Sequence, residues 1–528
     1  MGMFEYVEIR ERVIETVKKN AEYDTDKVSE ESNLAIDLGI NSIKKVNLLV
    51  DIEDAFGIDL DTDNLQPEDF TTVGQVINYV EDIVSNGLVT YAKDTVSTSD
   101  DSIPQSEEKE YYPLTSVQKR LFTLCEIENI FNMPFAVLIE GSLDVGRIES
   151  AFRQFIKRHE VFRTSFEYRD GNPVQIVHKA IDDFHIENVE ASESELDSFL
   201  NRFIRKFDLA KAPLLRVMLV KLSVNKHLLV IDIHHIISDG KSLGIITREL
   251  MSSYLGMELP EVKLQYRDFA EWQRIQFEPG KISKQERYWR DIFKDGIPRL
   301  KIPLDFERPE KPIFEVRDVT SSISGETVGK INEFVQKWSI TLNTLFFTVY
   351  SILLSKYSNQ EDVVVGSIVE GRNHPELVEH IGYYAYTIPV RLKIKGDDKV
   401  SVIFEMVKKA LTDAYKHMDY PFEKLTEGAG RIITKDPLLD TLMNFINEGS
   451  FDFQIEGLKI ANYDVKRRIT DMDFNLDIKN TPLEMTFVLR YNTSLFREET
   501  MVNFMNCFKN MVEEIIKNPV RKISDIKL

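Results

Sequence analysis

Apolar residues recur at helical spacing in the first 85 residues of the chain. Three stretches carry Val, Ile and Leu at intervals of three and four, at residues 5–19, 42–56 and 72–83. Gly57 ends the second stretch, and an acidic loop at residues 59–69, in which we expect a short helical turn, separates it from the third. This pattern predicts a small all-α bundle of four helices at residues 1–85.

The helical pattern is absent between residues 86 and 110. Ser, Thr and Asp fill residues 97–102, and a charged run at residues 107–110 follows. Because polar segments of this kind connect packed units, we predict a flexible linker at residues 86–110.

From Tyr111 onward, short apolar runs alternate with longer amphipathic stretches. The runs predict buried strands and the stretches predict helices. The strand-like runs are 135–139, 214–219, 228–233 and 362–368, and the helical stretches include 148–157, 243–255 and 404–415. About 420 residues without a second linker predict a mixed α/β unit of two packed lobes. We place an N-lobe at about 111–285 and a C-lobe at about 286–528.

Length and composition narrow the class of protein. A chain of 528 residues is too long for one hydrophobic core, and 43% apolar with 29% charged residues is ordinary for a soluble protein. No apolar run has the length of a membrane span, and the first twenty residues do not form a signal peptide. Cys125 and Cys507 lie far apart in apolar surroundings, which favours buried thiols over a disulfide or a metal pair. We therefore expect a cytoplasmic protein with no membrane partner and no metal.

Negative charge is concentrated at the N-terminus. The chain carries a formal charge of −21, which argues against a nucleic-acid partner. Residues 1–85 hold 20 acidic and 7 basic side chains, a net charge of −13. An acidic surface on a small unit suits docking with basic patches on several partners.

Candidate chemistry lies at the end of the apolar run 228–233. His234 and His235 follow that run, and Asp239-Gly240 begins a turn after them. Histidine is suited to acid–base work near neutral pH. A pair of adjacent histidines is more often a satisfied core pair. However, a carboxylate and a glycine four and five residues after His235 form a compact polar cluster, which favours a reactive site.

Ser42 begins the second helical stretch, after the loop 37–41. A serine in this position is by default a helix N-cap. Here a short glycine-containing loop leaves the hydroxyl accessible, and the acidic helix face follows. Residues 5–85 resemble the acyl carrier proteins, with Asn41 and Ile43 where Asp and Leu are usual. The resemblance implies 4′-phosphopantetheine attached covalently to Ser42.

The run His-His-x-x-x-Asp-Gly at residues 234–240 resembles the condensation domains of nonribosomal peptide synthetases, in the superfamily of chloramphenicol acetyltransferase. Six further blocks match such domains: Leu114–Phe122, Phe131–Pro134, Arg158–Phe166, Tyr266–Gln273, Ile381–Tyr384 and His417–Glu423. Their order and spacing fill residues 111–528. The resemblance implies a V-shaped pair of lobes with a tunnel, in which a donor thioester and an acceptor amine meet from opposite sides.

The same resemblance implies a role for each residue of the motif. The reaction is aminolysis of a thioester, and His235 matches the histidine that holds or deprotonates the attacking amine. His234 is implied to support the loop. Gly240 permits close approach of the reacting centre, and its N–H can meet the developing oxyanion. Much of the rate should come from positioning two tethered reactants.

Asp239 is implied to be structural rather than catalytic. It should form a buried charged pair with an arginine, for which Arg163 and Arg372 are candidates, and the loss of one partner would leave an uncompensated charge. Three positions depart from the family pattern. Lys241 occupies a position where Trp is common, and Tyr386 and Asp436 occupy positions where Asn is common. The first two bear on substrate preference rather than on the reaction.

Two alternatives to condensation remain. Epimerization domains share the two histidines and also follow a carrier, but their Glu-Gly-His-Gly-Arg and Asn-Tyr-Leu-Gly-Gln signatures are absent. Non-catalytic domains that recruit partners usually lose the second histidine, which is present here as His235. We therefore predict amide-bond formation in nonribosomal peptide or hybrid polyketide–peptide biosynthesis.

The order of the two units predicts the partners. A carrier that precedes a condensation domain supplies the donor, so the acyl thioester on the Ser42 arm is transferred to an amine supplied in trans, either on another carrier protein or as a free amine. A phosphopantetheinyl transferase would attach the arm, and a separate loading enzyme would charge it.

Overall fold

The computed structural model describes most of the chain. The described residues are 6–21, 28–35, 37–40, 42–56, 70–85, 102–127, 131–278, 283–310, 313, 315–418, 420, 424, 439–447, 457–465, 472–481 and 484–527.

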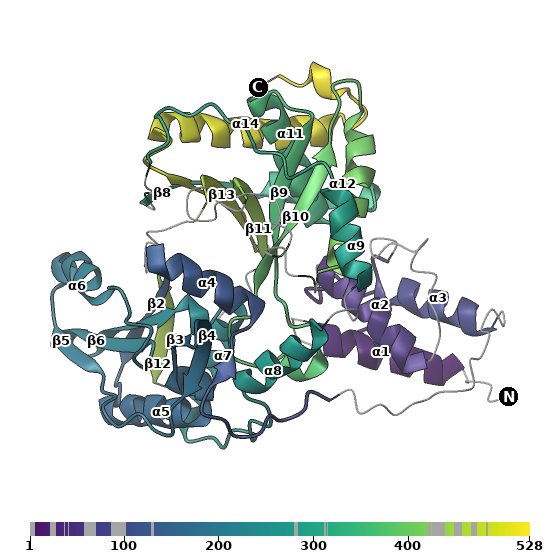
Figure 1. Ribbon diagram of the computed structural model, residues 1–528. Coiled ribbons are helices and arrows are strands. Elements are labelled where there is room, and N and C mark those ends of the chain that lie inside the picture. The colour runs from purple at the N-terminus through teal and green to yellow at the C-terminus, as the bar shows by residue number, and fades with distance from the viewer. Residues whose placement is uncertain are drawn as a thin grey trace.

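Among the described residues of the N-terminal unit, three helices lie at the positions that the apolar spacing predicts. They are α1 (Tyr6–Asn20), α2 (Ser42–Phe56) and α3 (Val73–Ser85). Their apolar faces meet in a separate small core that includes Val13, Ile52 and Val76, each at most 1% exposed. In Figure 1 the unit lies at the lower right, and α2 contacts helix α12 (Val400–Lys416) of the larger unit. The helical turn expected at 59–69 lies outside the described residues.

The first lobe of the larger unit is built on a five-stranded sheet of order β12-β2-β7-β6-β5. The strands are β2 (Asn132–Gly141), β5 (Glu187–Glu190), β6 (Leu215–Ser223), β7 (Lys226–His234) and β12 (Leu458–Tyr463). Its helices are α4 (Ser116–Ile127), α5 (Val145–Arg158), α6 (Leu196–Phe203), α7 (Gly240–Leu255) and α8 (Tyr266–Gln276). A small antiparallel sheet completes the lobe, with β1 (Tyr112–Pro113), β3 (Thr164–Arg169) and β4 (Asn172–Val177).

Strand β7 is apolar on both faces because both faces are covered. Leu229 and Ile231 point into the main core of the lobe, with α5 and α7. Leu228 and Val230 pack into a second cluster with α6 on the opposite face. The apolar run is therefore a strand buried on both faces, in agreement with the buried strand that the sequence predicts.

The second lobe is built on a six-stranded sheet of order β10-β9-β11-β13-β14-β8. The strands are β8 (Val316–Ser324), β9 (Asp362–Val369), β10 (Tyr386–Lys393), β11 (Thr441–Asn447), β13 (Phe474–Asn480) and β14 (Glu484–Asn492). The helices are α9 (Ser283–Ile292), α10 (Glu326–Lys337), α11 (Leu342–Ser358), α12 and α14 (Glu498–Lys517). In Figure 1 this lobe lies above the first, with α11 and α14 on one side of its sheet.

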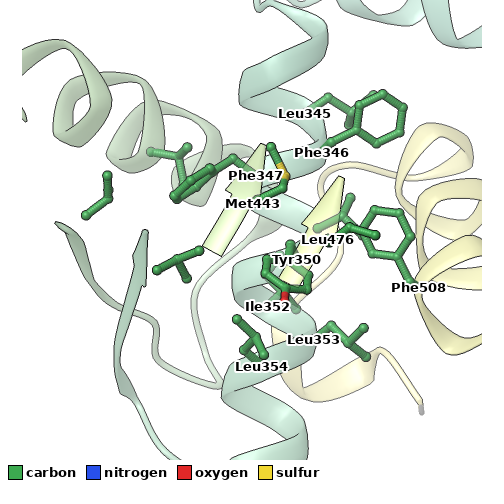
Figure 2. Packing of buried hydrophobic residues seen from close by; sticks show 14 of the residues in the cluster. Leu345, Phe346, Phe347, Tyr350, Ile352, Leu353, Leu354, Met443, Leu476 and Phe508 are labelled. Atoms are coloured by element: carbon green, nitrogen blue, oxygen red, sulfur yellow. The ribbon is translucent and has the colours of Figure 1, made fainter. Parts of the chain in front are cut away.

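Helix α11 is the centre of the second lobe. It is buried around most of its circumference, as expected of a helix that is apolar on all sides. Figure 2 shows its side chains Phe346 and Tyr350 among Met443, Leu476 and Phe508 from neighbouring elements. No single helix among the described residues is long and apolar enough to cross a membrane. Helices α10 and α11 are long and apolar enough only when they are taken together, and the two helices are bent by 99° relative to each other.

Two segments that follow residue 285 in sequence belong to the first lobe. Strand β12 follows the second lobe in sequence, yet it pairs antiparallel with β2 at the edge of the first sheet. Residues 377–384, between β9 and β10, contribute Leu377 and Ile381 to the core of the first lobe. These non-local pairings have no local sequence signal.

Part of the predicted flexible linker is folded against the first lobe, which corrects the prediction for residues 102–110. Ile103 is 3% exposed within the core of that lobe, and its N–H donates to Glu376 at 2.8 Å. Ser106 donates through N–H and Oγ to Asp268 at 2.8 and 2.7 Å. Composition alone could not reveal partners that lie more than 150 residues away. Residues 86–101 lie outside the described part.

Candidate active site

The two histidines and the Asp-Gly pair lie where β7 meets α7. His234 is the last residue of β7, His235 begins a 3-10 turn that ends at Ile237, and Gly240 is the first residue of α7. Asp239 caps the helix, because its carboxylate accepts from the N–H of Ser242 at 2.9 Å. The strand, the tight turn and the cap together fix the backbone of the whole motif.

His234 is a buried, neutral side chain. Its Nδ1 accepts from the N–H of Ile236 at 3.1 Å, so the proton of the neutral ring lies on Nε2, 3.7 Å from the Sγ of Cys125. Burial, together with the nearby His235 and Arg216, lowers the pKa of His234 to about 3. An imidazole held in this state supports the turn and does not exchange protons near neutral pH.

His235 is oriented quite differently. Its ring is partly exposed, and its Nδ1 lies 2.8 Å from the carbonyl oxygen of Ser238. Because a carbonyl only accepts, Nδ1 carries the proton in the neutral ring, which leaves the basic lone pair on Nε2. The backbone N–H of His235 donates to the carbonyl of Phe131 at 2.8 Å, and its ring packs against Tyr383 with centroids 4.6 Å apart.

Asp239 and Arg372 form a buried ion pair between the lobes. The two guanidinium nitrogens lie 2.9 Å from the two carboxylate oxygens, and the two side chains are 1–2% exposed. Burial by itself raises the pKa of Asp239, but Arg372 and the backbone N–H groups of Ser242 and Tyr384 outweigh burial, so the pKa lies below its ordinary value. The carboxylate therefore stays ionised and is not available as an acid.

Arg163, the other candidate partner of Asp239, lies elsewhere. Its guanidinium donates to the backbone carbonyls of Ile156 and His178 and lies 4.0 Å from the carboxylate of Glu160. It fixes the turn that leads into β3. The sequence offered both arginines, and only the fold shows that Arg372, 133 residues downstream, reaches Asp239.

Gly240 is exposed at the start of α7. A Cβ atom built there would meet no protein atom within 4 Å apart from its chain neighbours and the backbone of the helix itself. The space beside the first turn of α7 is therefore open to a ligand. The N–H groups of a helix start point into such a space and favour negative charge.

Two features of the site were not predicted from the sequence. The first is Tyr383 beside His235. The second is the buried carboxylate of Asp232, which lies two residues before His234 on the same face of β7. It accepts from the side-chain amide of Asn132 at 2.8 and 2.9 Å and lies 3.7 Å from Arg216. Arg216 in turn covers the ring of Phe207, which makes a T-shaped contact with His234. A charged residue within the apolar run of β7 was the available signal.

Ser42 is the first residue of α2, as predicted. The preceding loop turns at Gly39, whose φ of 67° favours glycine. A helix start binds phosphate through its unpaired N–H groups, so the local backbone fits a phosphopantetheine ester at this residue. Asn41 lies outside the described residues, as does Asp436.

The other two departures from the expected pattern lie near the junction of the lobes. Lys241 is the second residue of α7, and Tyr386 begins β10 and packs against the cores of both lobes. Both cysteines are free thiols of intermediate exposure. Within the described ranges, no group of three His, Cys, Asp or Glu residues could hold a metal ion.

Comparison with known families covers nearly the whole chain. Residues 108–528 match the family described as "Condensation domain", and residues 11–80 match the family described as "Phosphopantetheine attachment site".

Similar curated proteins are large synthetases. The chain is 38% identical over 432 residues to bacitracin synthase 3 of Bacillus licheniformis, which covers 81% of this chain and 7% of that protein. It is 36% identical over 449 residues to gramicidin S synthase 2 of Aneurinibacillus migulanus, which covers 84% of this chain and 10% of that protein. With bacitracin synthase 2 of Bacillus licheniformis the identity is 34% over 499 residues, 93% of this chain and 18% of that protein. The chain thus spans less than a fifth of the length of these relatives.

Solved structures share the fold of the larger unit. The X-domain from teicoplanin biosynthesis superposes with a TM-score of 0.75 at 24% identity and covers 81% of this chain and 100% of that one. A four-domain nonribosomal peptide synthetase bound to AMP and glycine gives 0.72 at 20% identity, over 81% of this chain and 35% of that one.

Proposed function

Because the chain belongs to the condensation-domain family and carries a phosphopantetheine attachment domain ahead of that domain, we propose that it forms an amide bond in nonribosomal peptide biosynthesis. The acyl group comes from the Ser42 arm, and the acceptor amine is supplied in trans. We propose the boundaries 1–85 for the carrier and 111–528 for the condensation domain, with residues 102–110 packed against its first lobe. The observation that carries the proposal is the state of His235, with Nδ1–H bound to a carbonyl and the ring partly exposed.

Ser42 is the proposed attachment residue of phosphopantetheine, which supplies a thiol that carries the acyl group as a thioester. Its position at the start of α2 supports this, since a phosphate ester there meets the N–H groups of the first helical turn. The acidic surface of the carrier would then be recognised by a phosphopantetheinyl transferase and a loading enzyme.

His235 is the proposed acid–base residue. The acceptor nitrogen attacks the acyl carbon, the new C–N bond forms, and the C–S bond breaks with release of the thiol. Nε2 of His235 is placed to bind the amine and to take its proton, which returns to the departing sulfur. The hydrogen bond from Nδ1 to the carbonyl of Ser238 fixes this tautomer.

The rest of the motif positions this histidine. His234 stays neutral and supports the turn, while the Asp239–Arg372 pair ties the start of α7 to the segment from the second lobe. Gly240 leaves space for the reacting centre, and its N–H is the proposed donor to the developing oxyanion. Acceleration then depends on holding both reactants at this junction.

Partner recruitment is the second candidate function. The likeness to the X-domain, which was solved in complex with OxyB from teicoplanin biosynthesis, favours it. Epimerization of the group held on the carrier is a third alternative. Both leave the acyl chain without a new amide bond, so the reaction products separate them from condensation.

The test is a product assay on chemically acylated protein. Intact-protein mass spectrometry would follow the carrier alone, with a loaded acceptor carrier, and with free amines. We expect amide product only when an acceptor is added. Amide formed without an acceptor would contradict the trans arrangement, and no amide in any arm would favour recruitment or epimerization.

A further inference from the structure

Tyr383 is the aromatic residue that contacts the ring of His235. The two ring centroids are 4.6 Å apart and the planes are inclined by 55°. Tyr383 is 9% exposed and belongs to the segment that returns from the second lobe to the first. The contact therefore joins a residue that follows β9 to the histidine at the end of β7.

The backbone that carries Tyr383 is fixed on both sides. The N–H groups of Tyr384 and Ala385 donate to Asp239 at 3.0 and 3.1 Å. On the other side, the carbonyl of Gly382 accepts from the Oγ of Ser242 at 2.9 Å. Asp239 therefore binds the backbone of this segment in addition to the side chain of Arg372.

Helix α8 also contacts this segment. The hydroxyl of Tyr266 donates to the carbonyl of Tyr383, and it lies 3.2 Å from the Oγ1 of Thr115. A Cβ atom at Gly382 would lie 2.0 Å from the ring of Tyr266, so the backbone and this ring are in full contact. The backbone on both sides of Tyr383 is thus held by hydrogen bonds to Asp239, Ser242 and Tyr266.

A hydrogen bond and a packed ring restrain different motions of an imidazole. The bond from Nδ1 to Ser238 sets the direction of one ring nitrogen, and the contact with the inclined ring of Tyr383 restricts the plane of the imidazole. Since the direction of Nε2 depends on both, we propose that Tyr383 is a positioning residue that fixes the plane of His235 for the reaction. This inference rests on the proposed acid–base function of His235.

We expect the aromatic ring of Tyr383, and not its hydroxyl group, to fix the plane of His235. Tyr383→Phe should retain kcat within about threefold, whereas Tyr383→Leu should lose about 10- to 100-fold in kcat, the scale expected of a misplaced reacting group. The KM for the acceptor should change little in both variants. Tyr111→Leu, at a tyrosine that is 41% exposed, is the matched control and should behave as the unmodified chain.

A second measurement does not depend on turnover. In protein labelled with ¹⁵N-histidine, the ring-nitrogen signals of His235, assigned by their loss in His235→Gln, should shift in Tyr383→Leu and stay in place in Tyr383→Phe. Unchanged signals in Tyr383→Leu, or equal loss of kcat in the Phe and Leu variants, would overturn the inference. Full activity of His235→Ala would instead overturn the proposed function, while the ring signals would still report whether Tyr383 fixes the imidazole.

Discussion

Replacing Asp239 by Asn should destabilise the larger unit by about 3–5 kcal/mol, the usual cost of removing one partner of a buried ion pair. The carboxylate accepts from both guanidinium nitrogens of Arg372 and from the backbone N–H groups of Ser242, Tyr384 and Ala385. Asn offers one acceptor oxygen in place of two, and its amide N–H₂ would face these donors. Arg372 would then keep its charge in a site where it is 2% exposed.

The assay is urea unfolding of the full chain, followed by tryptophan fluorescence, for Asp239→Asn, Arg372→Met and the double variant. Because the two residues share one interaction, the double variant should be more stable than the sum of the single losses predicts, by at least about 2 kcal/mol. The exposed pair Arg153–Glu149 supplies the control, and Glu149→Gln should change stability by less than about 0.5 kcal/mol.

The loss of unfolding free energy in Asp239→Asn should also be independent of pH near neutrality. The pKa of Asp239 is lower in the folded than in the unfolded chain, so its contribution is present above the unfolded value of about 4 and is lost only as pH falls through the folded value. Amide hydrogen exchange at Tyr384 and Ala385 should accelerate in the variant. A loss below about 1 kcal/mol, or additive single losses, would refute the ion-pair argument.

Two further predictions concern the carrier and the buried carboxylate behind His234. Coexpression with a phosphopantetheinyl transferase should add one phosphopantetheine group to the chain, as read by intact mass, and Ser42→Ala should abolish the gain; a modified Ser42→Ala protein would rule out this attachment site. Burial raises the pKa of Asp232 to about 6, although Arg216 and Asn132 oppose the shift. Between about pH 4 and pH 6 the folded chain therefore binds a proton that the unfolded chain has lost. Because of this extra proton, the free energy of unfolding falls as pH rises through that range. Asp232→Asn removes this loss, and its stability relative to the unmodified chain should rise by about 3 kcal/mol between pH 4 and pH 7 in urea titrations, two pKa units at 1.4 kcal/mol each. A difference that is the same at both pH values would contradict the raised pKa.

Local pattern was sufficient to predict several elements of this fold. Helices α1 and α2 and strand β7 are continuous in sequence and keep their apolar periodicity, so their bounds could be predicted within a few residues. The motif at residues 234–240 could be identified for the same reason, because a strand, a turn and a helix cap follow each other without interruption.

What could not be predicted depends on contacts between distant segments. Arg163 and Arg372 were equivalent candidates in sequence, and only the path of the chain after β9 brings Arg372 to Asp239. Strand β12 pairs with β2 across more than 300 residues, and Ile103 is buried although its neighbours are polar. Tyr383 was visible within a matched block, but its contact with His235 is a property of the folded junction.

The most direct test of the central claim is a single-turnover reaction with the acyl group loaded on Ser42 and an excess of loaded acceptor carrier. Intact mass spectrometry would follow the loss of the acyl group from the chain and the equal gain on the acceptor, in the unmodified chain, in His235→Ala and in the exposed-histidine control His185→Ala. We expect transfer that is about 10²–10⁴-fold slower in His235→Ala, the usual contribution of a positioned acid–base group, and unchanged in the control. Transfer at the unmodified rate in His235→Ala would contradict the proposed acid–base role of His235.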